Sequence, residues 1–265
     1  MEYTPINTVT VRVPDGGIAR LEYHASLPST VALAKEYANS GYPDRYIVFT
    51  DTLQTTDQTK KNKPVKKHGV FLSCILRPSI FTSQVGLLPH LAAVAFVTAL
   101  EEHTSKELGI GWISDIFCEG AKIGGITVEG KLDGEFNYEY IIISFSAELS
   151  EVDFPPRLAD MVRKVFESEN TSVSMIIAKN ILNKFFPLFA NLKNHVKFME
   201  IYSKKFVQRS SSAKYMEGGK RKKCKILSVD LENGALIVES AEKKIIKLNS
   251  PKNIVISKKL KPAKK

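Results

Sequence analysis

The stretch "GIGWISDIFCEGAKIGGITVEGKL", residues 109–132, decides how the middle of the chain folds. Apolar residues recur on both sides of Glu119-Gly120, which predicts two strands joined by a tight turn. Lys122 stands just before a glycine pair inside this apolar run. A lysine in that place either folds back to solvent along its aliphatic stem or points its charge at an anionic ligand.

The bulk composition is that of a globular protein with a sizeable core. The chain has 265 residues and 43% hydrophobic content, which predicts one large domain or a large domain with a small one. Cys74, Cys118 and Cys224 lie far apart without CxxC spacing, so we expect reduced thiols and no zinc or disulfide framework. We interpret Cys118 as a buried structural thiol rather than an acyl nucleophile, because no histidine follows at a telling distance.

The chain shows no targeting or membrane signal that we recognise. Residues 1–17 lack a basic segment followed by an apolar one, which is the pattern of a secretory signal. Apolar runs fall short of the roughly 20 residues that a membrane span needs. We therefore expect a cytoplasmic protein without a membrane partner.

The positive charge is large and clustered. The net charge is +10 and the pI about 9.3, which favours an anionic partner. Five basic residues fall in each of the ranges 59–68, 220–225 and 258–265. We interpret 259–265 as a basic disordered tail. Because 59–68 and 258–265 contain no aromatic residue on which a base could stack, nucleic acid is not the partner that we expect.

The first half of the chain predicts strands and two helices. A helix capped by Ser29 or Thr30 ends at Gly41, and an apolar helix is predicted at 84–109. Residues 53–69 are polar and lack periodicity, which predicts a long loop that covers a site. The strands are predicted at 6–13, 20–26, 45–52 and 70–78, followed by three within 111–149.

In the second half of the chain the predicted secondary structure changes twice. Helices are predicted at 157–168, 174–192 and 194–206, then a Ser/Gly-rich linker at 208–219, and finally short hairpins. The histidines do not space as a metal cluster. We therefore predict an α+β protein in which residues 1–210 form a mixed sheet flanked by helices and 215–258 form a small β-barrel.

Four segments together resemble the biotin–protein ligase family. They are "LPSTVALAKEYANSG" (27–41), "VFLSCILRP" (70–78), "WISDIFCEGAKIGGITVE" (112–129) and "ILSVDLENGALIVES" (226–240). The third is similar to the family motif "WPNDVLVDGKKIGGILVE". The resemblance covers about residues 20–256 and implies a class II synthetase-like catalytic domain with an SH3-like barrel. It implies a member without the DNA-binding domain of the repressor type.

The resemblance implies a two-step reaction. Biotin carboxylate attacks the α-phosphate of MgATP, which gives biotinyl-5'-AMP and pyrophosphate, and a carrier lysine then displaces AMP. The implied ligands are ATP, Mg²⁺ and biotin. The implied partner is the biotin carboxyl carrier domain of a carboxylase, and a homodimer is compatible with the sequence. Such chemistry needs positioning, positive charge and exclusion of water more than covalent participation of the protein.

The same resemblance implies the site residues, with no resident metal. Lys122 matches the lysine that bridges carboxylate and phosphate. The residues that match biotin contacts are Ser29, Thr30, Gln54, Gly124 and Gly125. The residues that fall at adenylate-binding positions are Asp115, Trp112, Thr59, Lys60 and Lys61.

Several family positions differ in this chain, and they leave the function open. The family's "GRGRxG" loop is replaced here by residues 56–59, which contain neither arginine nor glycine. Other departures are Val31, Gly111 in place of the lysine that precedes the tryptophan, Ile113-Ser114 in place of Pro-Asn, and Glu148 in place of an asparagine. In an active ligase the lysines of 60–67 would bind phosphate instead. The alternatives are a catalytically retired binding module and a related lipoate or octanoyl transferase.

Overall fold

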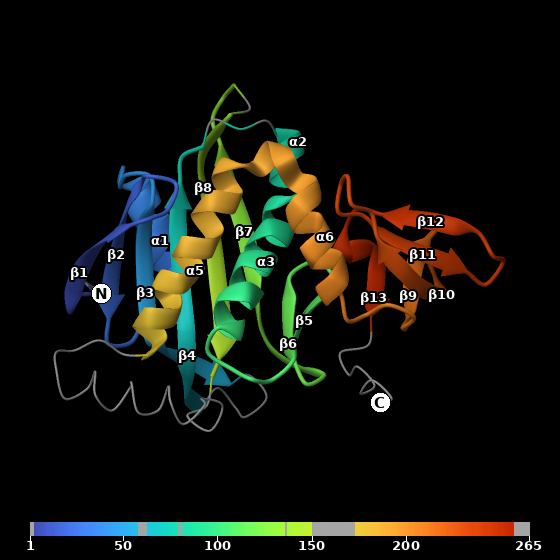
Figure 1. The fold of residues 1–265 in the computed structure, drawn as a ribbon, viewed down its shortest axis with the longest axis horizontal. Helices are drawn as coiled ribbons and strands as arrows, with labels where there is room; N and C mark the ends of the chain where they lie inside the picture. Colours follow the sequence, from blue (N-terminus) through green and yellow to red (C-terminus); the bar gives the residue numbers. More distant parts are fainter. Residues whose placement is uncertain are drawn as a thin grey trace.

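The computed structural model describes residues 3–57, 63–78, 80, 82–135, 137–149 and 173–256. Two β-sheets and the helices that cover the larger one make up the molecule (Figure 1). The α+β class and the mixed sheet flanked by helices are confirmed. The helix predicted at 157–168, the tail at 259–265, and Thr59, Lys60 and Lys61 lie outside the described residues.

The large sheet has eight strands, and all neighbours are antiparallel except β2 and β3, which are parallel and joined through α1. In spatial order the strands are β1 (Asn7–Arg12), β2 (Ile18–His24), β3 (Tyr46–Asp57), β4 (Lys63–Leu76), β8 (Tyr138–Glu148), β7 (Ala121–Leu132), β6 (Asp115–Cys118) and β5 (Leu108–Gly111). The two-residue turn between β6 and β7 has positive φ at both Glu119 and Gly120, as the right-handed twist of a hairpin favours.

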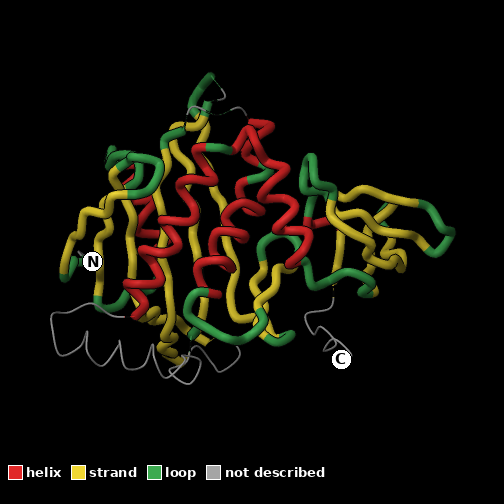
Figure 2. Tube along the Cα trace, viewed as in Figure 1, coloured by secondary structure: helices red, strands yellow, loops and turns green. Residues whose placement is uncertain are grey.

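Helices cover the two faces of this sheet unequally. One face lies under α3 (Leu88–Glu101), α5 (Val173–Ala190) and α6 (His195–Lys205), as Figures 1 and 2 show. The other face carries α1 (Thr30–Asn39), which packs on β3, β4 and β8. Successive residues of a strand point to opposite faces, so Ile75 belongs to the core under α1, while Cys74 belongs to the core under the other helices. Short turns of helix complete the fold at α2 (Thr82–Val85), η3 (Leu192–Asn194) and η4 (Pro251–Asn253).

The apolar character of α5 is explained by its packing. By length and composition alone this helix could cross a membrane. Ile177, Ile181 and Phe185 are completely buried, and α5 packs on α3 and on the sheet. Phe185 also makes an edge-to-face contact with Phe145 of β8, with ring centroids 5.7 Å apart. The hydrophobic side chains therefore belong to the protein's own core.

The prediction of a loop at 53–69 is wrong for the residues that the structure describes. Strands β3 and β4 stay paired as far as Asp57 and Lys63, well beyond the helix-covered part of the sheet. The reason is that the threonines of this segment favour an extended backbone, and backbone pairing does not require an apolar face. Hydrophobic periodicity predicts buried strands and misses a polar hairpin that extends from the sheet.

The prediction of one helix over 84–109 is also wrong. The helix α3 ends at Glu101, and Leu108 already begins strand β5. The segment between them turns on polar side chains, for example through the Thr104 hydroxyl, which accepts a hydrogen bond from the backbone N–H of Lys106 at 3.1 Å. Such local side-chain bonds offer the backbone an alternative to the helix.

The small sheet contains five strands in the order β12 (Ile245–Leu248), β11 (Leu236–Ser240), β10 (Lys220–Val229), β9 (Ser212–Glu217) and β13 (Ile254–Ile256). Strand β9 occupies half of the predicted linker, because Ala213 and Tyr215 alternate inward and Gly218-Gly219 supplies the hairpin turn. The terminal strands β12 and β13 do not pair. The β-rich unit is confirmed, and the closed barrel is not.

The two sheets meet at the carbonyl oxygen of Gly234, in the turn between β10 and β11. Trp112 donates its indole N–H to this oxygen at 2.8 Å, and His90 of α3 donates from Nε2 at 3.1 Å. Gly234 has positive φ, and the His90 ring lies where a Cβ at this position would stand. The ring of Tyr202 lies 4.9 Å from that of His90. The junction is therefore a buried contact in which Trp112 and His90 share one acceptor.

This junction predicts a loss of stability in mild acid. Burial lowers the pKa of His90 to about 4 from 6.5. Between these values the unfolded chain binds a proton that the native chain rejects, so this contribution is complete above pH 6.5 and is lost as pH falls to 4. We expect a loss of about 3 kcal/mol over this window. Urea unfolding at several pH values measures it.

The variant His90→Gln removes the titrating group and should flatten that part of the pH profile. His195→Gln, which changes a partly exposed histidine paired with Glu232, serves as the matched control. An unchanged profile in His90→Gln would show that other groups cause the acid sensitivity.

Candidate functional site

A polar area of the large sheet lies beyond the N-terminal end of α1. Residues directly opposite one another in neighbouring strands share a face, and two such rows cross the sheet here. One row joins Thr127, Ser144 and Ser73, and the next joins Asp115, Gly125, Ser146 and Phe71. Apart from the buried ring of Phe71, the residues in these rows are small or polar, which makes this part of the face suited to a ligand. We call these seven residues the open face.

A chain of three hydroxyl groups connects the open face to α1. Ser73 donates to Oγ1 of Thr30 at 2.8 Å, and Ser73 and Ser144 are also 2.8 Å apart. All three residues are buried. Because the Ser73 proton points to Thr30, Ser144 must donate to Ser73, and the Thr30 proton remains available for a further acceptor.

The predicted residues Ser29 and Gln54 lie near the N-terminal end of α1. Ser29 is the N-cap of α1, and its side chain accepts from the Ala32 backbone N–H at 3.1 Å. Exposed Gln54 donates its side-chain amide to Ser26 at 3.0 Å, and its backbone N–H bonds to Leu27. These contacts hold the end of β3 against the segment that leads into α1.

A β-bulge determines where Lys122 points. The register of β6 and β7 passes from Ile116 opposite Gly124 to Phe117 opposite Lys122, so Ile123 is the extra residue. Without the extra residue Lys122 would share the face of Gly124 and point toward the helices. With it, Lys122 lies on the same face as Asp115, and its Nζ is 2.6 Å from Oδ1 of that carboxylate.

Both members of this pair are about two-fifths exposed, so they remain accessible to a ligand. The structure therefore brings together Lys122, Asp115 and Gly125 on one side of the open face, and Thr30 on the other. In the described part of the chain, no cluster of three or more His, Cys, Asp or Glu residues could hold a metal ion.

The segment before Asp115 is held by buried hydrogen bonds. Trp112 is 6% exposed, and its backbone N–H donates to Oε1 of Gln208 at 2.9 Å. The hydroxyl of Tyr202 donates to the carbonyl of Ile113 at 2.7 Å, and burial raises the pKa of Tyr202, which keeps that proton in place. Trp112 is thus placed in the junction between the sheets, and its predicted adenylate contact stays a prediction.

The two predicted glycines have structural reasons as well. A Cβ on Gly124 would stand 1.9 Å from the carbonyl oxygen of Ser146 in the neighbouring strand. A Cβ on Gly125 would stand 3.1 Å from the carbonyl of Ser114 and 3.5 Å from Oδ1 of Asp115. Gly124 therefore permits close pairing of β7 with β8 at the bulge, and Gly125 leaves room beside Asp115.

Two of the departures noted in the sequence have a visible counterpart. A Cβ on Gly111 would stand 2.6 Å from the ring of Phe117 and 3.0 Å from Nε2 of Gln208. A lysine side chain therefore has no room at this position. Glu148, at the end of β8, forms an ion pair with Lys67 of β4. A carboxylate thus lies at the edge where the family motif has an amide.

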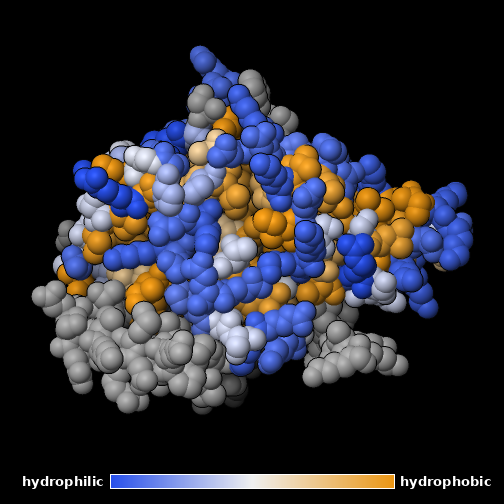
Figure 3. Space-filling view, in the orientation of Figure 1, coloured by the Kyte–Doolittle hydropathy of each residue, from blue (hydrophilic) through white to orange (hydrophobic). Residues whose placement is uncertain are grey.

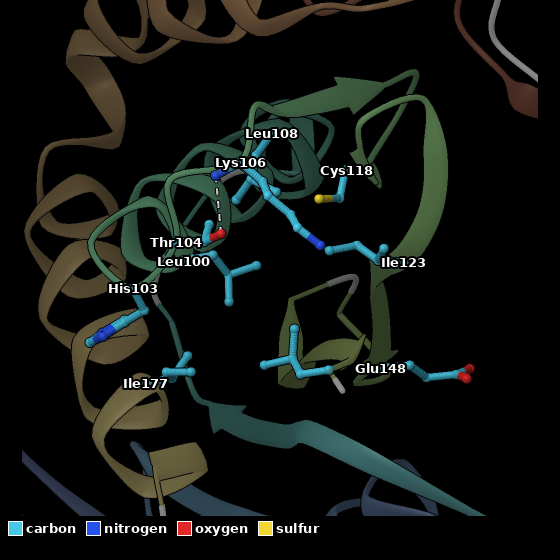
Figure 4. Close-up of a pocket in the computed structure, with 10 residues that line it drawn as sticks. Leu100, His103, Thr104, Lys106, Leu108, Cys118, Ile123, Glu148 and Ile177 are labelled. Carbon is cyan, nitrogen blue, oxygen red and sulfur yellow. Dashed lines mark hydrogen bonds between the residues drawn. The ribbon is translucent and has the colours of Figure 1, made fainter. Parts of the chain in front are cut away.

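A cavity on the opposite face of the sheet is too small to be the site. It lies between the end of α3, α5 and the bulge, and Figure 4 shows Ile123 and Cys118 facing Leu100 and Ile177 across it. Its volume is about 40 Å³, which is room for one or two water molecules. Ile123, the extra residue of the bulge, forms part of its lining.

Sequence reasoning missed four residues that shape this site, namely Ser73, Ser144, Gln208 and Tyr202. The two serines had a signal, since each is a polar residue inside an otherwise apolar strand, in "VFLSCIL" and "IIISFSA". Gln208 and Tyr202 follow from tertiary contacts alone and carry no local signal.

Comparison with known proteins gives one consistent result. The chain is 31% identical over 158 residues to the bifunctional ligase/repressor BirA of Bacillus subtilis, a match over 58% of this chain and 48% of that protein. The chain thus spans about half the length of this curated relative. No protein-family model matches.

Two solved structures extend the similarity to the fold. The apo biotin protein ligase of Aquifex aeolicus matches with a TM-score of 0.63 at 16% identity, over 89% of this chain and 99% of that one. The same enzyme in complex with biotin and ATP matches with a TM-score of 0.62 at 15% identity, over 89% and 99%.

The bulge predicts an unequal tolerance of alanine at two glycines. Gly124→Ala would force β7 away from β8, and we expect Tm to fall by about 5–10 °C. Gly134→Ala is the matched control, because a Cβ there meets nothing within 4 Å. Thermal unfolding followed by circular dichroism measures both. Equal Tm values for the two variants would contradict the register described here.

Proposed function

We propose that the chain is a divergent member of the biotin protein ligase family and acts as a biotin–protein ligase. Two similarities support the proposal: 31% identity over 158 residues to BirA of Bacillus subtilis, and the fold shared with the biotin protein ligase of Aquifex aeolicus. In the proposed reaction, biotin and MgATP form biotinyl-5'-AMP and pyrophosphate. A lysine amine of a carboxylase carrier domain then attacks the anhydride carbonyl, and AMP leaves. We expect this to take place in the cytoplasm.

The observation that carries the proposal is the placement of Lys122. The bulge turns its ammonium group onto the open face. The hydroxyl chain from Ser144 through Ser73 to Thr30 lies at the other end of that face. An adenylation reaction brings a carboxylate and a triphosphate together, so their mutual repulsion must be reduced by a positive charge. Lys122 is suited to that role, because it pairs with Phe117 of β6 and lies two residues before Gly124, which pairs with both β6 and β8.

Asp115 positions the lysine without holding it tightly. The pair is partly exposed, and exposed ion pairs contribute about 0–1 kcal/mol. An incoming phosphate with more than one negative charge can therefore recruit Lys122 away from Asp115. In the proposed complex Asp115 remains a neighbour of the adenylate.

The other end of the open face is suited to the ring of biotin. The free proton of Thr30 can be donated to the ureido carbonyl oxygen, and the Ser144–Ser73–Thr30 chain orients that proton. Ser29 and Gln54 carry further donors beside this position. The N-terminal end of α1, with its partial positive charge, faces the same area and favours the acceptor oxygen.

The metal enters this proposal with the nucleotide. Mg²⁺ is commonly held by one or two carboxylates together with substrate phosphates and water. This mode of binding agrees with the site, where Asp115 is the carboxylate paired with Lys122. Among the described residues, no group of three or more His, Cys, Asp or Glu side chains could hold a metal by itself. We therefore treat MgATP as the substrate.

The variant Lys122→Ala tests the proposed reaction. We expect biotin-dependent ATP–pyrophosphate exchange to fall by about 10²–10³-fold, because a charge that stabilises the transition state is lost. Circular dichroism and Tm should stay close to the parent values, since the side chain is exposed.

The matched control is Lys131→Ala, which removes an exposed, ion-paired lysine from the same strand and should leave exchange unchanged. If Lys122→Ala retains the parent rate while the parent enzyme is active, the assigned role of Lys122 is wrong.

A second candidate function is a retired ligase fold that binds without catalysis. Two contacts favour it. Glu148 places a carboxylate, paired with Lys67, at the edge of the open face, where it would repel phosphate. The lysine that precedes the family tryptophan has no room here, because Phe117 and Gln208 fill the space beside Gly111.

Isothermal titration separates the two candidates. A ligase should bind biotin with micromolar or tighter affinity, and MgATP should strengthen that binding. The variant Glu148→Asn should strengthen it further, because it removes a negative charge near the phosphates. The retired candidate would be supported if both the parent chain and Glu148→Asn are folded but give no heat with biotin, whether or not MgATP is present.

A further inference from the structure

The outer face of the small sheet carries a basic groove. Its lining includes five cations, Lys214, Arg221, Lys223, Lys225 and Lys243, and one carboxylate, Glu239. The groove is open, with about 680 Å³ of accessible space, and runs across β13, β9, β10 and the end of β11. On the side of the molecule seen in Figure 3, hydrophilic side chains likewise cover the outer tip of this sheet.

The groove cations are arranged as a row. Arg221, Lys223 and Lys225 occupy alternate positions of β10, so their side chains leave the same face. Alternate residues of a strand are about 7 Å apart. That spacing resembles the step between successive phosphates on an extended nucleic acid strand.

The groove cations are only partly neutralised within the described part of the chain, where Glu239 lies opposite Lys225. Of the five cations that line the groove, Lys243 pairs with Glu239 at 2.8 Å. The other four have no ion-pair partner among the residues that the structure describes. Lys214 and Lys223 lie directly opposite one another. Like charges in that position destabilise a sheet, so the arrangement acts against the fold unless an anion binds between them.

The composition of the groove distinguishes the kind of anion. Protein–protein interfaces are enriched in aromatic residues and depleted of lysine at their centre. Here lysine dominates, the lining contains no aromatic side chain, and the apolar members Val255, Ala213, Cys224 and Ala241 are small. Contacts to a phosphate backbone require lysine and arginine alone and carry no base sequence information.

We propose that this groove binds the phosphate backbone of a single nucleic acid strand, without sequence preference. Arg221, Lys223 and Lys225 follow the strand along β10, and Lys214 faces them from β9. Nucleic acid is not the partner expected from the sequence, because the basic runs at 59–68 and 258–265 lack aromatic residues. The groove's lining lacks aromatic side chains as well, so the proposed binding rests on phosphate contacts alone and involves no base stacking.

Fluorescence anisotropy of a labelled, mixed-sequence single-stranded DNA tests the proposal, with the full chain over a range of salt concentrations. The groove variant is Lys214→Ala with Lys223→Ala. We expect about tenfold weaker binding at low salt, and a slope of log K against log salt that is smaller by about 1.4 in magnitude, at about 0.7 for each phosphate contact.

The control variant is Lys193→Ala with Lys197→Ala, which removes two exposed charges from the large unit and keeps the net charge equal to that of the groove variant. Equal loss in both variants would overturn the proposal, because net charge alone would then explain binding. The Tm of the groove variant should be no lower than that of the parent at low salt.

Two competitors decide between occupants. Poly-glutamate, at the same concentration of charge as the DNA, should displace the strand poorly from the parent chain, and so should vesicles of anionic lipid. If either competes as well as unlabelled DNA, and the groove variant abolishes that competition, the occupant is an acidic protein or a membrane and the proposal is wrong.

Discussion

The extra residue at Ile123 is the constraint on which the candidate site depends. A strand alternates its side chains, so a shift of one residue exchanges the two faces for every position beyond it. The bulge makes that exchange once, between Gly124 and Lys122, and places Ile123 against the small cavity under α3 and α5. Lys122 thereby shares the face of Asp115 and Gly125. The close approach of Gly124 to Ser146 is part of the same geometry, since a side chain at 124 would push β7 out of register.

The rest of the open face follows from how little of the sheet α1 covers. The helix packs its apolar side on Val48, Ile75 and Ile142, and its first residue, Thr30, meets the hydroxyls of Ser73 and Ser144 at the limit of that core. Buried hydroxyl groups need partners, and here each serves the next. The boundary between the apolar core and the open face is therefore a line of three satisfied side chains that ends in one proton free to meet a ligand.

The sequence predicted the fold class and the hairpin at Glu119-Gly120, because a tight turn between two apolar segments is a local property. It gave Lys122 and Asp115 only as separate site residues that the family resemblance implies. It failed at the hairpin of β3 and β4, where polar threonines and lysines form strands without a hydrophobic pattern. It also failed at β9, which was interpreted as a linker. Gln208 and Tyr202 could not have been found, because their roles arise from contacts with Trp112 and Ile113 that are 96 and 89 residues away in the chain.

The departures from the family motif are connected through these contacts. Glycine at 111 makes room for Phe117 and for the Gln208 side chain, which in turn bonds the backbone of Trp112. The indole of Trp112 then reaches Gly234 and ties the small sheet to the strand that leads to Asp115. A lysine restored at position 111 would have to displace Phe117 and Gln208 before it could approach a phosphate. The proposed adenylation site therefore relies on the positive charge of Lys122, which binds phosphate as a single point charge and without the bidentate geometry of arginine.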